Sequence, residues 1–116
     1  RELTRRYLGC EARDDREGIL QDSHWASGQI GYFPAYAVGT AAAAQLMAGI
    51  KKELDVDALL RAGELGPINR LLEERIWRRG ALYPPRELMS RALGGPLDLS
   101  FYASYLSDKL SEVYGE

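Results

Sequence analysis

The 116-residue sequence has little metal-binding or redox chemistry, since it contains one histidine, His24, and one cysteine, Cys10. A single cysteine excludes a disulfide within the chain, which is typical of a cytoplasmic protein. Catalytic zinc sites usually use about three protein ligands drawn from histidine, cysteine and carboxylates. We therefore assign no metal ligand to this chain.

Long apolar runs and excess charge are also missing. The longest apolar stretch, around residues 41–50, is too short and too interrupted to span a bilayer. We expect no signal peptide. The net charge of −2 provides no general attraction to nucleic acid or to an anionic membrane. The sequence thus predicts a cytoplasmic protein without a nucleic-acid or membrane partner.

One small basic group is the exception to this charge pattern. Arg75, Arg78 and Arg79 flank Trp77 near the end of a predicted helix. A nucleic-acid surface needs a longer basic stripe than this. A favourable interaction with the helix dipole explains the arginines, and a salt bridge to a partner surface is the alternative.

The alternating pattern of a half-buried strand does not occur, whereas helical spacing recurs. We expect an all-α fold of about five helices, forming a single helical region over residues 1–116. Residues 1–8 have the pattern of the end of a helix. The other helices are predicted over 35–53, 56–62, 66–79, 85–93 and 99–114, with Asp55 and Asp98 as caps.

Polar, aromatic and glycine residues are concentrated in the stretch from Gly18 to Gly39. It holds four of the twelve glycines, two of the seven tyrosines and the only histidine. Asp22 and His24 are two residues apart, so the carboxylate can orient the imidazole, which then serves as a proton or hydrogen-bond donor near neutral pH. The alternative is a partly buried histidine that only holds this loop together. Gly39, inside a predicted helix, indicates close packing or a nearby ligand.

Two segments of this stretch carry a family resemblance. Gly18-Ile-Leu-Gln21-Asp22-Ser-His24-Trp25 fits the pattern GxxQDxHW, and Gly31-Tyr32-Phe33-Pro34-Ala-Tyr36 with Gly39 fits GYFPxYxxG. Both patterns resemble signatures of the carboxypeptidase Taq family of zinc metallocarboxypeptidases. A weaker similarity continues through GELGPI and LYPPREL, so the chain is similar to the last quarter of such an enzyme.

The resemblance implies an enzyme that removes C-terminal amino acids from peptides and works as a homodimer. It also implies a zinc ion held by an HExxH helix and a later glutamate, which lie upstream of GxxQDxHW and are absent from these residues. The chain would then supply the opposite wall of the cleft, with an upstream part of the same protein as its partner. We expect the isolated 116-residue chain to be inactive.

The resemblance also suggests roles for five residues of the matched segments. The candidate catalytic donors are His24 and Tyr36, with Tyr32 as the second choice between the tyrosines. Tyr32, Gln21 and Asp22 are the candidate substrate-binding residues, and Gln21 and Asp22 are also expected to support His24 or nearby backbone groups. Trp25 is expected to be a packing anchor. Arginines are expected to bind the terminal carboxylate of the substrate, but none lies within the matched segments.

A different class of function remains open. The chain could be a non-catalytic helical module, either a remnant or a piece that assembles with a separate polypeptide. The absence of an HExxH sequence from these residues favours this alternative. Its cleft wall would then be an apolar and aromatic surface that requires a partner.

Overall fold

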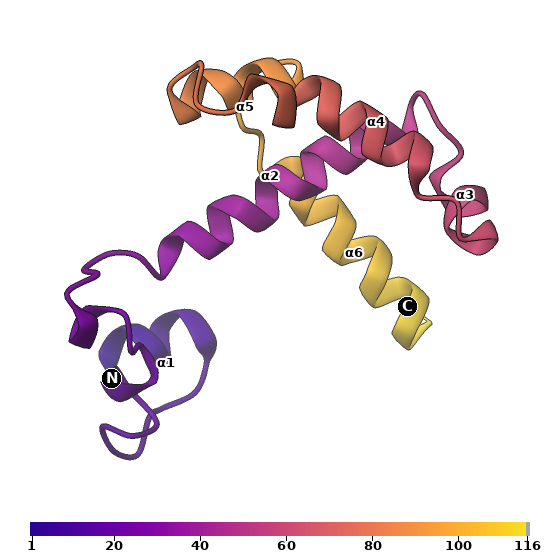
Figure 1. Ribbon diagram of the computed structural model, residues 1–116. Coiled ribbons are helices and arrows are strands. Elements are labelled where there is room, and N and C mark those ends of the chain that lie inside the picture. Colours follow the sequence, from indigo (N-terminus) through magenta and orange to yellow (C-terminus); the bar gives the residue numbers. More distant parts are fainter. Residues whose placement is uncertain (116) are drawn as a thin grey trace. The chain divides into compact units, whose positions relative to one another are not determined.

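The computed structural model describes residues 1–115 and contains six α-helices, with no strand in that range (Figure 1). The predicted all-α fold of about five helices is confirmed, and each of the six predicted helical segments contains an α-helix. Three short 3-10 helices, η1 (Ile19–Gln21), η2 (Trp25–Ser27) and η3 (Trp77–Arg79), complete the secondary structure. The α-helices are α1 (Glu2–Leu8), α2 (Pro34–Lys51), α3 (Val56–Ala62), α4 (Gly66–Arg75), α5 (Pro85–Leu93) and α6 (Ser100–Tyr114).

The chain divides into two compact units, Arg1–Ala37 and Val38–Glu116. The N-terminal unit contains α1 and the long loop with η1 and η2. Helix α1 ends at Gly9, whose backbone is left-handed and whose N–H donates to the carbonyl oxygen of Arg5. The first residues of α2, up to Ala37, also belong to this unit, and the C-terminal unit contains the rest of α2 and the remaining helices.

The core of the C-terminal unit lies where α2, α3 and α4 meet. Ile50, Val56 and Ile68 are its buried side chains, and five leucines pack around them. The turn into α3 is stabilised by Asp55, whose carboxylate accepts a hydrogen bond of 3.0 Å from the N–H of Ala58. The predicted cap at Asp55 is therefore confirmed, because this bond satisfies one of the free N–H groups of the first turn.

Two predicted boundaries and one predicted environment differ from the structure. Helix α4 ends at Arg75 rather than near Arg79, since Ile76 leaves the helical conformation and η3 follows. Helix α6 begins at Ser100, and Asp98 accepts from the N–H of Ser100 at 2.8 Å without capping the helix in the usual way. The described residues provide no close packing at Gly39, because outside its own helix backbone and its chain neighbours no atom lies within 4 Å of the position that a Cβ would take. The alternative, a ligand near Gly39, stays a prediction.

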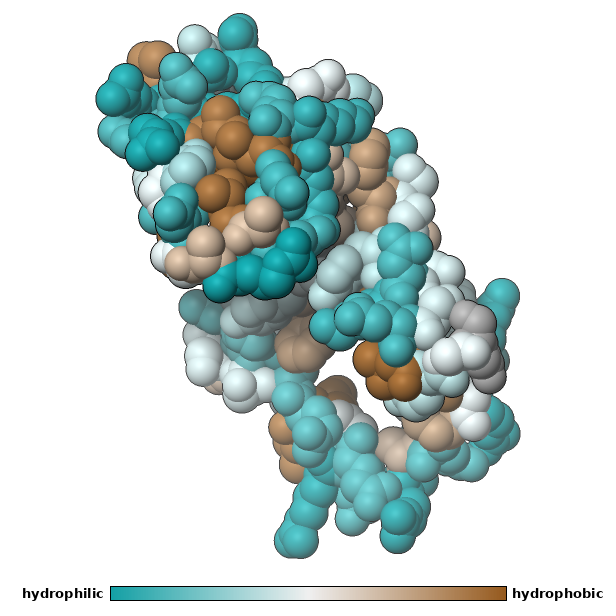
Figure 2. Space-filling model, turned by 90° about the vertical axis from the view of Figure 1, so that its right-hand side faces the viewer, coloured by the Kyte–Doolittle hydropathy of each residue, from teal (hydrophilic) through white to brown (hydrophobic). Residues whose placement is uncertain are grey.

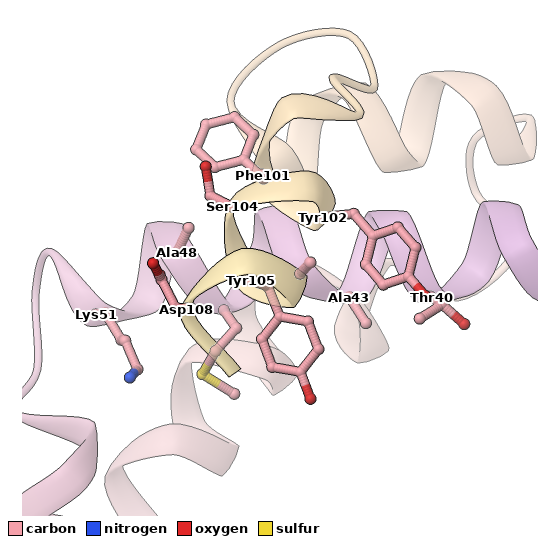
Figure 3. A pocket seen from close by; sticks show the side chains of 11 residues that line it. Thr40, Ala43, Ala48, Lys51, Phe101, Tyr102, Ser104, Tyr105 and Asp108 are labelled. Atoms are coloured by element: carbon pink, nitrogen blue, oxygen red, sulfur yellow. The ribbon is translucent and has the colours of Figure 1, made fainter. Parts of the chain in front are cut away.

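Helices α2 and α6 enclose a groove with an alanine-rich wall and an aromatic wall. Figure 3 shows Tyr102 extending from α6 toward Thr40 and Ala43 of α2. The rings of Tyr102 and Tyr105 stack with their centroids 6.3 Å apart. Small side chains on α2 thus leave room for the tyrosines of α6.

The loop that leads into α6 is fastened to α2 by a buried amide. Gln45, which is 7% exposed, donates from Nε2 to the carbonyl oxygen of Pro96 at 3.0 Å. Its Oε1 accepts from the N–H of Asp98 at 2.8 Å. One side chain therefore satisfies two backbone groups of a loop 51 to 53 residues away in sequence.

Several large apolar side chains of the C-terminal unit are exposed. On α6, the side chains of Leu110 and Val113 are 56% and 64% exposed, and no residue of this helix is buried. Hydrophobic residues also gather in patches on the face drawn in Figure 2. Exposed apolar surface of this kind is typical of a region that contacts another segment or another protein. Among residues 1–115, no helix combines the length and the apolar character needed to cross a membrane.

Replacing Gln45 by methionine tests the loop attachment. Two hydrogen bonds at about 0.5–1.5 kcal/mol each would be lost, so we expect the free energy of unfolding to fall by about 1–3 kcal/mol. Urea unfolding of the 116-residue chain, followed by circular dichroism, measures this change. The matched control is Gln29→Met at an exposed position, where surface substitutions typically change stability by less than about 0.5 kcal/mol. Equal effects of the two substitutions would contradict the proposed attachment.

Candidate functional site

The candidate site is formed by the loop that joins α1 to α2. Two 3-10 turns, η1 and η2, lie in this loop; Gly28 directly follows η2, and Gly31 lies between η2 and α2. Gly28 and Gly31 have φ values of 79° and 75°, a left-handed conformation that side chains with a Cβ rarely adopt. The turns at these two glycines bring His24 into contact with Tyr32, just before α2, and with Tyr36, in its first turn. These tyrosines are 8 and 12 residues further along the chain than His24.

Asp22 holds His24 by two hydrogen bonds to the same carboxylate oxygen. Oδ1 of Asp22 accepts from the backbone N–H of His24 at 2.9 Å and lies 2.8 Å from Nδ1 of the imidazole. The first bond closes a local turn of the kind that aspartate often makes two residues before its donor. The second fixes the plane of the ring. The predicted orientation of His24 by Asp22 is thus present in the structure.

The same contacts alter the acidity of Asp22. The hydrogen bond from the backbone N–H of His24, together with the side-chain bond and the charge of His24, lowers the pKa of Asp22 below its usual 3.8. Partial burial opposes this effect but does not cancel it. Asp22 is therefore a carboxylate at neutral pH, and Nδ1 of His24 must carry the hydrogen that bonds to it.

The opposite nitrogen of His24 faces Tyr36. Nε2 lies 3.3 Å from the hydroxyl oxygen of Tyr36. With Nδ1–H committed to Asp22, a neutral imidazole accepts from the tyrosine hydroxyl through Nε2, whereas an imidazolium donates from Nε2. Asp22, His24 and Tyr36 thus form a chain of polar groups that can move or present a proton.

Aromatic rings support both sides of this chain. The ring of Tyr32 stacks on His24 with the centroids 4.9 Å apart and an angle of 28° between the planes. Phe33 approaches His24 edge-on at 5.8 Å, and Tyr36 contacts the rings of both Tyr32 and Phe33. The side chain of His24 is 21% exposed, while Tyr32 and Tyr36 remain 46% and 56% exposed. The imidazole is therefore held firmly, and the tyrosines are accessible.

Five residues form this cluster: Asp22, His24, Tyr32, Phe33 and Tyr36. The sequence predicted a role for four of them but none for Phe33. The helix α2 begins at Pro34, so Tyr32 lies before it and does not share a helical face with Tyr36. Their rings still meet, with centroids 5.6 Å apart. The crowding of three aromatic residues around Pro34 was the signal that could have placed Phe33 in the cluster.

Gln21 and Trp25 fasten the loop rather than contact the imidazole. Nε2 of Gln21 donates to the carbonyl oxygen of Arg16, and Nε1 of Trp25 donates to that of Ile19 at 3.3 Å. Both bonds stay within the loop and brace η1. The structure therefore brings Asp22, His24, Tyr32 and Tyr36 together and places Gln21 on the supporting side.

The described residues do not fit a catalytic metal ion. Among residues 1–115, no three side chains of histidine, cysteine, aspartate or glutamate converge on one point. His24 has both ring nitrogens engaged, one with Asp22 and one with Tyr36. The arrangement instead suits donation of a hydrogen bond or a proton to a neighbouring group.

Known proteins with similar sequences are carboxypeptidases. Thermostable carboxypeptidase 1 of Pyrococcus furiosus is 44% identical over 105 residues, which cover 90% of this chain and 21% of that protein. Carboxypeptidase 1 of Bacillus subtilis is 43% identical over 109 residues, which cover 93% of this chain and 22% of that protein. The chain thus spans about a fifth of the length of these curated relatives.

Solved structures agree with this similarity. Metallocarboxypeptidase 1 of Trypanosoma cruzi matches with a TM-score of 0.84 and 40% identity over 92% of this chain and 22% of that one. The crystal structure of BsuCP matches with a TM-score of 0.82 and 41% identity over 96% of this chain and 22% of that one. The family model of carboxypeptidase Taq (M32) metallopeptidases matches residues 1–110, nearly the whole chain, and the chain belongs to this family.

Proposed function

We propose that these residues form the C-terminal part of a zinc-dependent, cytoplasmic metallocarboxypeptidase, which removes amino acids from the C-terminus of peptides. The family assignment and the names of the relatives support this activity. The observation that carries the proposal is the chain of Asp22, His24 and Tyr36, because it places a fixed donor pair on a surface that a peptide can reach.

His24 and Tyr36 are the proposed catalytic residues. When a peptide bond is attacked, negative charge develops on its carbonyl oxygen, and fixed donors lower the barrier. An imidazolium whose Nδ1–H is held by the Asp22 carboxylate presents Nε2–H, and the Tyr36 hydroxyl lies beside it. Since neither group has to rotate into place, the cost of reorganisation is small.

Tyr32, Asp22 and Gln21 are the proposed substrate-binding residues. Tyr32 stacks on the imidazole and is accessible, so its ring and hydroxyl can contact the peptide directly. Asp22 acts on the substrate chiefly by orienting His24. Gln21 acts through the loop backbone, since its side chain bonds to the carbonyl of Arg16.

The metal of this enzyme is proposed to be zinc, bound by residues outside this chain. The described residues offer no cluster that could hold it, so no step of the reaction at the metal is assigned to them. We accordingly propose that the 116-residue chain alone is inactive and that its partner is an upstream part of the same protein. We further propose that residues 1–116 act as one helical region of that enzyme.

The exposed apolar surface supports an assembly of this kind. Leu99, Leu110 and Val113 in and before α6 are each more than half exposed. Burial of such side chains is worth about 25 cal/mol per Å² of apolar surface, so the surface favours contact with the upstream part or with a second copy in a homodimer. A non-catalytic helical module would use the same surface for a separate polypeptide.

The first experiment measures peptidase kinetics of the complete protein that carries these residues. We expect His24→Ala to lower kcat far more than it weakens ground-state binding, because its contact forms in the transition state. Tyr36→Phe should lower kcat about a hundredfold, the usual effect of losing one such donor. The matched control is Tyr7→Phe, which removes a hydroxyl from an exposed tyrosine in α1.

Three outcomes separate the possibilities. An unchanged kcat in His24→Ala would rule out its catalytic role. A normal rate in Tyr36→Phe with a slow Tyr32→Phe variant would transfer the donor role to Tyr32. Absence of carboxypeptidase activity in the metal-loaded complete protein would favour the non-catalytic module, and co-elution with a separate polypeptide in size-exclusion chromatography would then identify its partner.

The acidity of Asp22 gives a second prediction. A carboxyl whose pKa is lower in the folded state stabilises the fold above its unfolded pKa, near 3.8, and this contribution is lost as pH falls through the folded value. Because the bond to the His24 N–H is the largest cause, that amide should lose its exchange protection over the same acidic range. NMR titration of the Asp22 carboxyl carbon and hydrogen exchange at His24 measure both.

Asp22→Asn provides the control for this titration. Its amide cannot ionise, so exchange at His24 should show no transition in the acidic range where the wild-type carboxylate is protonated. A wild-type Asp22 that titrates at or above 3.8 would contradict the hydrogen-bonded geometry.

A further inference from the structure

A second polar site lies in the C-terminal unit, at a cavity of about 420 Å³ that is lined by residues from the end of α2, the end of α4 with η3, and α5. Four cationic side chains line it: Lys52, Arg75, Arg79 and Arg91. The only carboxylate among the lining residues is Glu53. The remaining lining residues are Gln45, whose side chain is a polar amide, and five apolar or small residues: Leu46, Gly49, Ala92, Leu93 and Gly94.

Two of these arginines are held in place by the protein. Arg75 forms an ion pair with Glu53 and lies over Gly49, where a Cβ would come 3.8 Å from Nη1. Arg91 donates to one oxygen of Glu87 from Nε at 3.0 Å and from Nη2 at 2.8 Å. Its guanidinium also lies 4.4 Å from the centre of the Tyr83 ring. Both forks are thus oriented before any ligand arrives, which lowers the entropic cost of binding.

The other two cations are not neutralised. Within residues 1–115, the side chains of Lys52 and Arg79 make no hydrogen bond or ion pair, and Arg79 is only partly exposed. The four cations face two carboxylates, Glu53 and Glu87. The cavity therefore keeps two positive charges, whose combined field attracts an anion.

We propose that this cavity binds a doubly charged oxyanion, namely the phosphate group of a small phosphate monoester. A phosphate monoester carries about −1.5 to −2 charges at neutral pH, which matches the two uncompensated positive charges. Guanidinium forks fit phosphate oxygens with two parallel hydrogen bonds. The apolar wall would take up the organic part of the ester. This site is separate from the residues proposed to act on peptides and does not depend on that activity.

Binding of two probes to the complete protein tests the proposal. Inorganic phosphate and phenyl phosphate are titrated by isothermal calorimetry at constant ionic strength, with chloride as the reference salt. We expect both to bind, and phenyl phosphate to bind more tightly because its ring contacts the apolar wall. Arg79→Gln should weaken both affinities about tenfold or more, since one charged fork is lost.

The matched control is Arg61→Gln, the same loss of charge at an exposed position of α3 in the same unit. It should leave both affinities unchanged. Arg79→Lys keeps the charge but not the forked guanidinium, so the phosphate affinity of this variant should fall between those of wild type and Arg79→Gln. If Arg79→Gln does not fold, the phosphate affinities of Arg79→Lys and Lys52→Gln test the proposal instead.

Three results would overturn the proposal. Absence of phosphate binding to the wild-type protein would mean that another segment fills the cavity or that the charges are solvated. Equal weakening by Arg79→Gln and Arg61→Gln would place the phosphate elsewhere on the protein. Tighter binding of inorganic phosphate than of phenyl phosphate would show an anion site without a subsite for an organic group, which contradicts the ester.

Discussion

The geometry of the candidate site depends on one carboxylate oxygen, Oδ1 of Asp22. This atom accepts hydrogen bonds from the backbone N–H and from the ring Nδ1–H of His24. The backbone bond folds the turn, and the ring bond decides which nitrogen of His24 faces Tyr36. Because one atom does both, the shape of the loop and the chemistry of the imidazole cannot vary independently. The two left-handed glycines and the stack of Tyr32 on His24 only complete an arrangement that this oxygen begins.

The sequence predicted those parts of the fold that are determined by neighbouring residues. Asp55 acts within the first turn of α3, and its predicted cap is confirmed. Gly9 after α1 and the prolines that open α2 and α5 act over the same short range. The end of α4 at Arg75 could not be read in this way, because helical spacing continues to Arg79 although Ile76 leaves the helix. The link between Gln45 and the loop before α6 joins residues more than 50 apart, and its only sequence signal was a glutamine on an apolar stripe.

The candidate site was predictable in its members but not in its geometry. The spacing of Asp22 and His24 indicated the oriented imidazole, since a two-residue separation is what a local turn requires. The contact between His24 and Tyr36 depends on the path of the loop through Gly28 and Gly31, which no periodicity reports. For the same reason, the basic cavity could not be predicted from the sequence, because Lys52, Arg79 and Arg91 come from three separate parts of the chain. Of the three arginines near the end of the predicted helix 66–79, only Arg75 and Arg79 line the cavity.

The two sites differ in their net charge, and this difference suits the role proposed for each. At His24, both ring nitrogens have a partner, so the imidazole is fixed but carries no charge until it gains a proton. At the cavity, Arg75 and Arg91 are fixed while Arg79 and Lys52 are left over, so a permanent positive field remains. A fixed donor without permanent charge suits a group that stabilises charge developing during a reaction, because its interaction with the substrate is needed only in the transition state. A permanent positive charge suits a site for a ligand that is already an anion, because the attraction acts from the first encounter.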